Sequence, residues 1–133
     1  MATLEVIHTY RHLYRALLHA VQFAQPARFV ARDRLRRAFR EGEGQLDNRS
    51  LIRTLRFLEA AARTRGIEHK VLKNLLFVDY HRYYDSRRPW KHVERAMKQP
   101  PKQDTQKHIE KTAYKHYDMT VAMLNKSMGL CLR

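Results

Sequence analysis

The scarcity of chain-breaking residues is the feature that most limits what this sequence can fold into. Only 4 Gly and 4 Pro interrupt its 133 residues, so it has few of the turns that a many-stranded sheet requires. Between these breaks, apolar residues recur at steps of three and four, which is the period of an amphipathic helix. The sequence therefore predicts an all-α protein of one domain, large enough to fold without disulfides.

The first half of the chain is expected to contain three helices. One covers about residues 2–23, with an apolar face and an opposite face rich in His and Arg. The next begins just after Pro26 and ends at the glycines of residues 42–44. A third runs to about residue 65. Three polar residues are candidates to cap its N-terminus: Asp47, Asn48 and Ser50.

The second half is expected to be less compact. A fourth helix covers about residues 67–84, either as a separate element or as a kinked continuation of the third. Residues 86–104 contain three prolines and many cations, which predicts an exposed connector with one helical turn near residues 93–97. A last helix is expected at about residues 105–126. Residues 1–85 are thus predicted to hold the core, and residues 86–133 to be a basic extension of the same domain.

The chain is strongly basic, with a formal net charge of +14 and a pI of about 10.4. Such a surface attracts an acidic partner: a nucleic acid, an anionic membrane or an acidic protein. Residues 1–65 contain 13 Arg and no Lys, whereas residues 66–133 contain 5 Arg and 9 Lys. Each half carries a net charge of +7, so charge alone does not identify the partner.

Cysteine usage and the N-terminal composition bear on the compartment. A single cysteine, Cys131, indicates a reducing compartment such as the cytosol or the mitochondrial matrix. No apolar run approaches the roughly 20 residues that span a bilayer. Residues 1–40 hold 8 Arg against Glu5 and Asp33, a composition typical of mitochondrial transit peptides. Because this segment also has the pattern of folded core, an uncleaved internal targeting signal to the matrix is expected.

Two stretches of the first half carry a family resemblance: Tyr10-Arg-His-Leu-Tyr-Arg-Ala-Leu-Leu-His19 and Arg32-Asp-Arg-Leu-Arg-Arg-Ala-Phe-Arg40. The tripeptide Leu13-Tyr14-Arg15, the two leucines after it and the Arg-rich second helix together resemble the LYR-motif family of mitochondrial proteins. The resemblance covers about residues 4–65. His19 stands where family members often carry a basic residue, and the extension beyond Gly66 has no part in the motif.

The resemblance implies an antiparallel three-helix LYR bundle, here with additional C-terminal helices, that binds the mitochondrial acyl carrier protein. The bundle accepts the acyl chain of the carrier's phosphopantetheine arm, and no other cofactor is expected. Since the carrier is acidic, basic side chains would bind it through charge-assisted hydrogen bonds. The implied carrier-binding residues are Tyr14, Arg15, Arg11, Arg32, Arg36, Arg37 and Arg40. An acyl chain also needs an apolar channel, and its candidate lining residues are Leu17, Leu35, Phe39, Leu55 and Leu58.

Aromatic residues alternate with Arg around residues 79–92. This pattern suits stacking on RNA bases with neutralisation of phosphates, docking onto a protein, or packing of the fourth helix on the core. The candidate docking or RNA-binding residues are Arg82, Tyr83, Tyr84, Arg87, Arg88, Trp90 and Lys91.

The sequence offers no candidate catalytic or metal site. His8 and His12 have a spacing that suits a shared metal, but no third ligand is placed nearby. Glu68-His69 lacks the second His of a zinc-peptidase motif, and Cys131 lies at the terminus. A non-enzymatic protein without a bound metal is expected.

These observations together predict an adaptor that serves as assembly factor or accessory subunit of a large mitochondrial complex, with the mitochondrial ribosome favoured. A respiratory-chain complex and the iron–sulfur cluster machinery are the alternative clients. An rRNA-binding basic protein that uses no carrier protein is the alternative from another class.

Overall fold

The computed structural model describes residues 4–42, 47–84 and 89–132. The described residues form helices and no strand, which confirms the all-α prediction. Six helices follow one another: α1 (Leu4–Ala20), α2 (Ala27–Glu41), α3 (Asn48–Arg63), α4 (Ile67–Tyr83), α5 (Trp90–Met97) and α6 (Asp104–Met128). The short α5 occupies the place where one helical turn is expected.

The helix ends follow from local chemistry. Asp47 is the N-cap of α3: its Oδ1 accepts a hydrogen bond from the Arg49 backbone N–H at 3.1 Å, and the Ser50 hydroxyl donates to Oδ2 at 2.6 Å. Gly42 ends α2, where a Cβ atom would lie 2.7 Å from the Ala38 carbonyl oxygen. The breaks at Pro26 and Gly42 are therefore confirmed.

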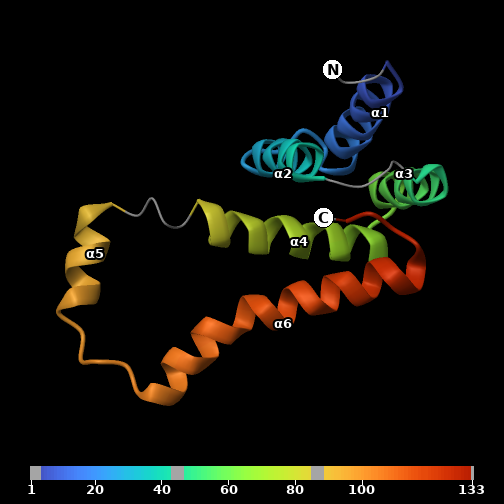
Figure 1. The fold of residues 1–133 in the computed structure, drawn as a ribbon. Coiled ribbons are helices and arrows are strands. Elements are labelled where there is room, and N and C mark those ends of the chain that lie inside the picture. Colours follow the sequence, from blue (N-terminus) through green and yellow to red (C-terminus); the bar gives the residue numbers. More distant parts are fainter. Residues whose placement is uncertain (1–3, 43–46, 85–88, 133) are drawn as a thin grey trace.

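The third and fourth helices are separate elements. α3 ends at Arg63, and the extended residues Thr64 and Gly66 separate it from α4. Figure 1 views α3 nearly end-on while α4 runs across the picture. The alternative of one kinked helix is therefore wrong.

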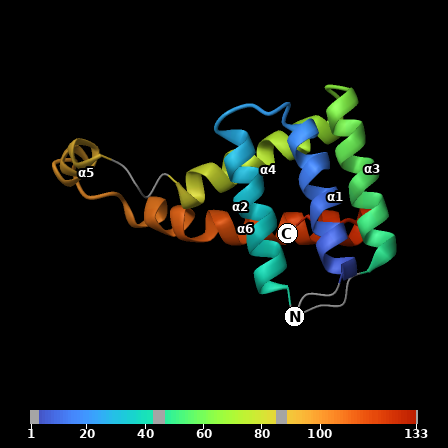
Figure 2. The same ribbon diagram turned by 90° about the horizontal axis from the view of Figure 1, so that it is seen from above.

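The helices are arranged in two layers. α1, α2 and α3 run side by side and alternate in direction, and α4 and α6 cross beneath them (Figures 1 and 2). Within this arrangement α1 packs against α2 and α3, and α4 packs against α2 and α3. α5 and residues 98–103 after it extend away from both layers.

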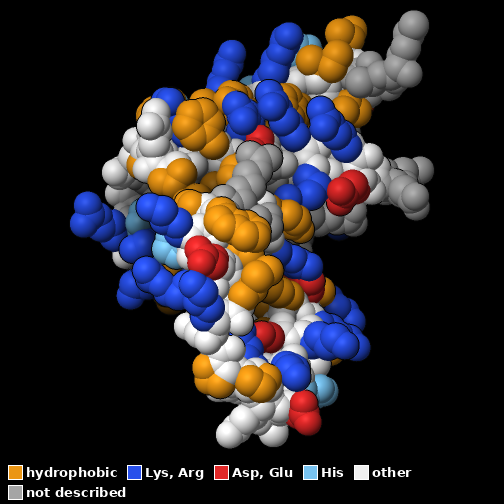
Figure 3. Space-filling model, turned by 90° about the vertical axis from the view of Figure 1, so that its left-hand side faces the viewer, with side chains coloured by type: hydrophobic (Ala, Val, Ile, Leu, Met, Phe, Trp, Pro, Cys, Tyr) orange, Lys and Arg blue, Asp and Glu red, His pale blue; other side chains and the backbone are white. Residues whose placement is uncertain are grey.

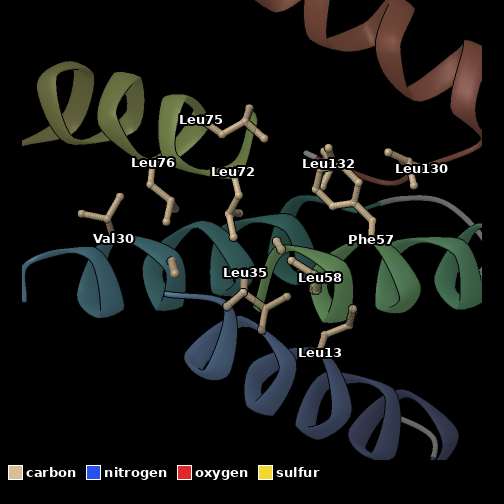
Figure 4. Packing of buried hydrophobic residues seen from close by; sticks show 13 residues of the cluster. Leu13, Val30, Leu35, Phe57, Leu58, Leu72, Leu75, Leu76, Leu130 and Leu132 are labelled. Atoms are coloured by element: carbon tan, nitrogen blue, oxygen red, sulfur yellow. The ribbon is translucent and has the colours of Figure 1, made fainter. Parts of the chain in front are cut away.

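The hydrophobic core lies where the two layers meet (Figure 4). Each described helix except α5 and α6 contributes buried residues. The labelled core side chains are Leu13, Val30, Leu35, Phe57, Leu58, Leu72, Leu75, Leu76, Leu130 and Leu132. Full burial of a side chain of this kind stabilises the fold by about 1.5–3 kcal/mol.

The C-terminal tail completes this core, so the prediction that the core ends before residue 86 is wrong. Leu130 and Leu132 are each only 7% exposed, while Cys131 between them is exposed. Asn125 holds the tail in place, since its side chain both donates to the Leu132 carbonyl and accepts from the Leu132 N–H, at 3.0 Å each. The Cys131 N–H donates to the Thr54 hydroxyl at 3.1 Å.

Gly129 makes the turn that returns the tail to the core. It follows α6 with φ of +64°, a left-handed conformation that glycine adopts without strain. A Cβ atom at Gly129 would also meet the end of the exposed Arg53 side chain, which is flexible enough to move aside. The left-handed φ is therefore the main reason for glycine at this position.

None of the described helices has the length together with the apolar character that crossing a membrane would require.

Candidate functional site

The tripeptide Leu13-Tyr14-Arg15 lies on α1, and its three side chains extend from the core to the surface. Leu13 is buried at 6% exposure, Tyr14 is half-buried, and Arg15 is exposed. The rings of Tyr10 and Tyr14 stack with centroids 6.1 Å apart, and Tyr10 meets Phe39 edge-on at 5.3 Å. These three rings form an aromatic row that joins α1 to the end of α2. The exposed Arg15 directly follows Tyr14 in the sequence.

The arginines predicted to bind the carrier separate into two groups. Four are exposed, and none of the four forms an ion pair with any described residue: Arg11, Arg15, Arg36 and Arg40. Arg32 is half-buried, hydrogen-bonds to Asp33 at 3.1 Å and lies over the Phe29 ring. Arg37 is bound inside the molecule, as described below. Figure 3 shows Lys and Arg side chains over much of one face of the molecule, with few Asp and Glu among them.

A cavity of about 880 Å³ is lined by residues of α1, α2 and α3 on one side and of α4, α6 and the tail on the other. Its volume is in the roughly 300–1,000 Å³ range of small-molecule sites. Four of the five predicted channel residues line it: Leu17, Leu35, Phe39 and Leu58. Leu55 does not; it is half-buried and packs against the core instead.

The sequence interpretation missed the other wall of this cavity. That wall is formed by Leu72, Leu75, Leu76, Val121, Leu130 and Leu132. The cluster of leucines in α4 and the Leu-Cys-Leu pattern of the tail were the available signals. The family motif ends before Gly66 and the core is expected to end before the connector, so neither the motif nor the expected core includes these residues.

One part of the cavity wall is charged. Asp79 is only 4% exposed, and its Oδ2 accepts hydrogen bonds from Arg34 at 2.6 Å and from Arg37 at 3.1 Å. The Arg37 guanidinium also lies 3.8 Å from the centre of the Tyr83 ring. We call Arg34, Arg37 and Asp79 the arginine–aspartate cluster. It joins α2 to α4, and it leaves the Arg37 guanidinium turned toward the molecule's own groups instead of toward a partner.

α6 contributes further polar residues to the same part of the wall. Asp118 accepts a hydrogen bond from Arg82 at 2.8 Å, and this bond raises the pKa of Arg82. Tyr117 is half-buried, and its hydroxyl oxygen is shielded from solvent without a hydrogen-bond partner among the described residues. Burial raises the pKa of Tyr117, so its hydroxyl is protonated at neutral pH.

The aromatic and basic segment predicted for docking is largely engaged within the molecule. Arg82 pairs with Asp118, Tyr83 lies against Arg37, and the Tyr84 hydroxyl donates to Asp33. Desolvation alone would raise the Asp33 pKa, but the bonds from Tyr84 and Arg32 outweigh it and lower that pKa. Arg87 and Arg88 lie outside the described residues. Trp90, which is 69% exposed, and Lys91 lie at the surface, and Tyr83 is also exposed although it contacts Arg37.

A second row of cations, which the sequence interpretation also missed, follows the outer side of α3. It consists of Arg49, Arg53, Arg56 and Arg63, all exposed and without an ion pair to any described residue. Their spacing of three, four and seven residues places them along one helix face. The spacing of these arginines, opposite the apolar side of the helix, is the signal for this row in the sequence.

Within the described part of the chain, no group of three or more His, Cys, Asp or Glu side chains is arranged to hold a metal ion. His8 and His12 lie exposed on α1.

Comparison with protein-family models, with curated proteins and with solved structures gives no match to this chain.

Proposed function

We propose that this chain is an adaptor of the LYR type that binds acylated mitochondrial acyl carrier protein in the matrix and attaches it to a large mitochondrial complex. The observation that carries the proposal is the cavity, because four of the residues predicted to line an acyl channel lie on its wall. Its volume and its leucines suit an acyl chain, which gains about 0.8 kcal/mol per buried methylene.

The exposed arginines of α1 and α2 supply the second part of the proposal. Arg11 and Arg15 on α1, and Arg36 and Arg40 on α2, have no ion-pair partner among the described residues. An acidic carrier would provide partners, and such charges mainly set orientation and the rate of encounter. The proposed carrier surface therefore comprises these four residues with Tyr14, and it excludes Arg37, which is held by Asp79.

The client complex is proposed from charge. A net charge of +14 and the exposed arginine row of α3 favour a client with an anionic surface, and the mitochondrial ribosome fits best. The same row also favours the second candidate, an rRNA-binding protein without a carrier. A respiratory-chain complex and the iron–sulfur machinery are the remaining clients.

Charge reversal at Arg15 tests the proposal. We expect Arg15→Glu to weaken binding of acylated carrier protein roughly tenfold or more, because one charge-assisted hydrogen bond is replaced by repulsion. Arg63→Glu makes the same charge change at an exposed position on another helix, α3, and it should leave carrier binding nearly unchanged. The measurement is co-purification of the tagged protein from mitochondria, followed by titration with purified carrier.

Two results would contradict this proposal. Equal losses for Arg15→Glu and Arg63→Glu would rule out the carrier surface. Absence of carrier from the purified sample, together with RNA binding that falls steeply with salt, would favour the second candidate.

A further inference from the structure

The charged part of the cavity wall holds two arginines against one buried carboxylate. Arg34 and Arg37 share one oxygen of a single carboxylate, Asp79. The nearby Asp118 is already paired with Arg82. This part of the wall thus presents the guanidinium groups of Arg34, Arg37 and Arg82 against the carboxylates of Asp79 and Asp118, while two exposed carboxylates, Glu41 and Asp47, also line the cavity. Arg34 and Asp79 are largely buried. A positive charge that is partly removed from water without a full partner favours the entry of an anion.

The Tyr117 hydroxyl beside this charge is also without a partner. No described residue accepts or donates a hydrogen bond to it, although its oxygen is shielded from solvent. Native proteins nearly always satisfy such a group, so each exception calls for an explanation such as an absent ligand. Tyr117, Arg34, Asp79, Arg82 and Asp118 all line the same cavity.

The remaining wall is mainly apolar, and its polar members are Glu41, Asp47, Ser50, Thr54 and Asn125. Its leucines include Leu13, Leu17, Leu35, Leu58, Leu72, Leu75, Leu76, Leu130 and Leu132. A molecule that complements both parts has one anionic oxygen-bearing group and a long hydrocarbon chain.

We propose that the cavity is a binding site for a free long-chain carboxylate. Its head accepts a hydrogen bond from the Tyr117 hydroxyl and neutralises the excess charge of Arg34 and Arg37, while its chain lies along the leucines. This inference goes beyond the carrier proposal and does not rest on it, since a free fatty acid requires only the cavity and no exposed arginine of α1.

Displacement of a fluorescent polyene fatty acid from the purified full-length protein tests the site. The competitors share a twelve-carbon chain and differ in the head: dodecanoate, methyl dodecanoate, dodecanol and dodecyl phosphate. We expect dodecanoate to bind roughly tenfold or more tightly than its methyl ester, the difference that a hydrogen bond to a charged group makes. Equal affinity of acid and ester, failure of dodecanoate to displace the probe, or tighter binding of the phosphate would overturn the proposal.

A matched pair of tyrosine variants locates the head group. Tyr117→Phe removes the buried hydroxyl and keeps the ring, whereas Tyr114→Phe makes the same change on the same helix at a residue that is 39% exposed. We expect Tyr117→Phe to lower the affinity for dodecanoate roughly tenfold and to leave the ester unchanged. Tyr114→Phe should change neither.

Folding does not complicate this comparison, because Tyr117→Phe deletes a hydroxyl that has no described partner. Unchanged dodecanoate affinity in a helical Tyr117→Phe protein would overturn the assignment. No carrier protein is present in these experiments, and the carrier proposal is decided by Arg15→Glu, so each proposal can fail without the other.

Discussion

At the scale of single residues, three neighbours in the tripeptide face three environments. Leu13 is in the core, Tyr14 is half-buried beside Tyr10, and Arg15 is in solvent. A helix turns by about 100° per residue, so such a sequence of environments is what one wall of a bundle produces. Of the three side chains, only Arg15 is fully accessible to a partner, whereas Leu13 stabilises the core.

Asp79 is the residue on which the charged part of the cavity depends. Asp79→Asn removes the negative charge that two arginines share, so it leaves partly buried positive charge uncompensated. We expect the free energy of unfolding to fall by about 3–5 kcal/mol, as when one partner of a buried ion pair is removed. Urea denaturation followed by circular dichroism measures this.

Asp118→Asn is the control for that measurement. It makes the same change in an ion pair whose aspartate side chain is 52% exposed, and exposed pairs contribute about 0–1 kcal/mol. A loss at Asp79 no larger than the loss at Asp118 would show that the arginine–aspartate cluster is not a buried pair.

At the scale of the elements, α6 and the tail differ in how they are held. α6 has no buried residue, and its contact with the core runs through the half-buried Tyr117, Val121 and Leu124. The tail, by contrast, inserts Leu130 and Leu132. Most of the stabilising burial at this end of the chain therefore comes from the last few residues, and the long helix positions them.

Deletion of residues 130–133 should loosen α6 while α1–α4 remain folded. Removing two buried leucines costs about 1.5–3 kcal/mol each, and it also removes the Asn125 and Thr54 hydrogen bonds. We expect faster amide hydrogen exchange throughout α6, measured by mass spectrometry. Cys131→Ala removes only the 3.4 Å contact between the Cys131 Sγ and the Thr54 hydroxyl and keeps the backbone bond to Thr54 and both leucines, so it should leave exchange in α6 nearly unchanged. Protection of α6 that survives the deletion would argue against the tail as its anchor.

At the scale of the whole molecule, α5 and the first part of α6 project from the two layers of helices (Figure 1). We call residues 89–111 the arm. α5 has no buried residue, and residues 94–111 are all exposed. The arm follows α4 in the chain, and after the arm the rest of α6 runs back beneath α4 to the tail (Figure 1). The arm is thus a loop that both ends fix, with Trp90 and Met97 exposed along it.

Limited trypsin digestion should cut first between Lys91 and Lys111. Cleavage requires local unfolding, which is easiest where few side chains are buried. The chain offers many other sites, including Arg49, Arg53 and Arg56 on α3, so the choice of site reports on structure. The fragments should remain together in native size-exclusion chromatography, because α6 and the tail stay docked. Early cleavage in α3, or separation of the fragments, would contradict this arrangement.

The sequence by itself determined the helices and most of their ends; α1, which was expected to reach Phe23, ends at Ala20, and Gln22 and Phe23 have positive φ. The signals that set the helices and their ends act within a few residues, so they can be recognised without knowledge of the fold. These signals are the helical periodicity, Pro26, Gly42 and the Asp47 cap. The same holds for Leu17, Leu35, Phe39 and Leu58, which lie on the apolar faces of their helices and line the cavity. Their role in binding a chain stays a prediction.

The tertiary structure alone decided which charges are free and what closes the core. Arg36 and Arg37 are neighbours in sequence, yet Arg36 is exposed and Arg37 is bound to Asp79, 42 residues away. Leu130 and Leu132 entered the core because Gly129 turns the chain back toward Thr54. Pairings of this kind depend on how helices cross, and the crossing is set by packing between distant segments that no local pattern records.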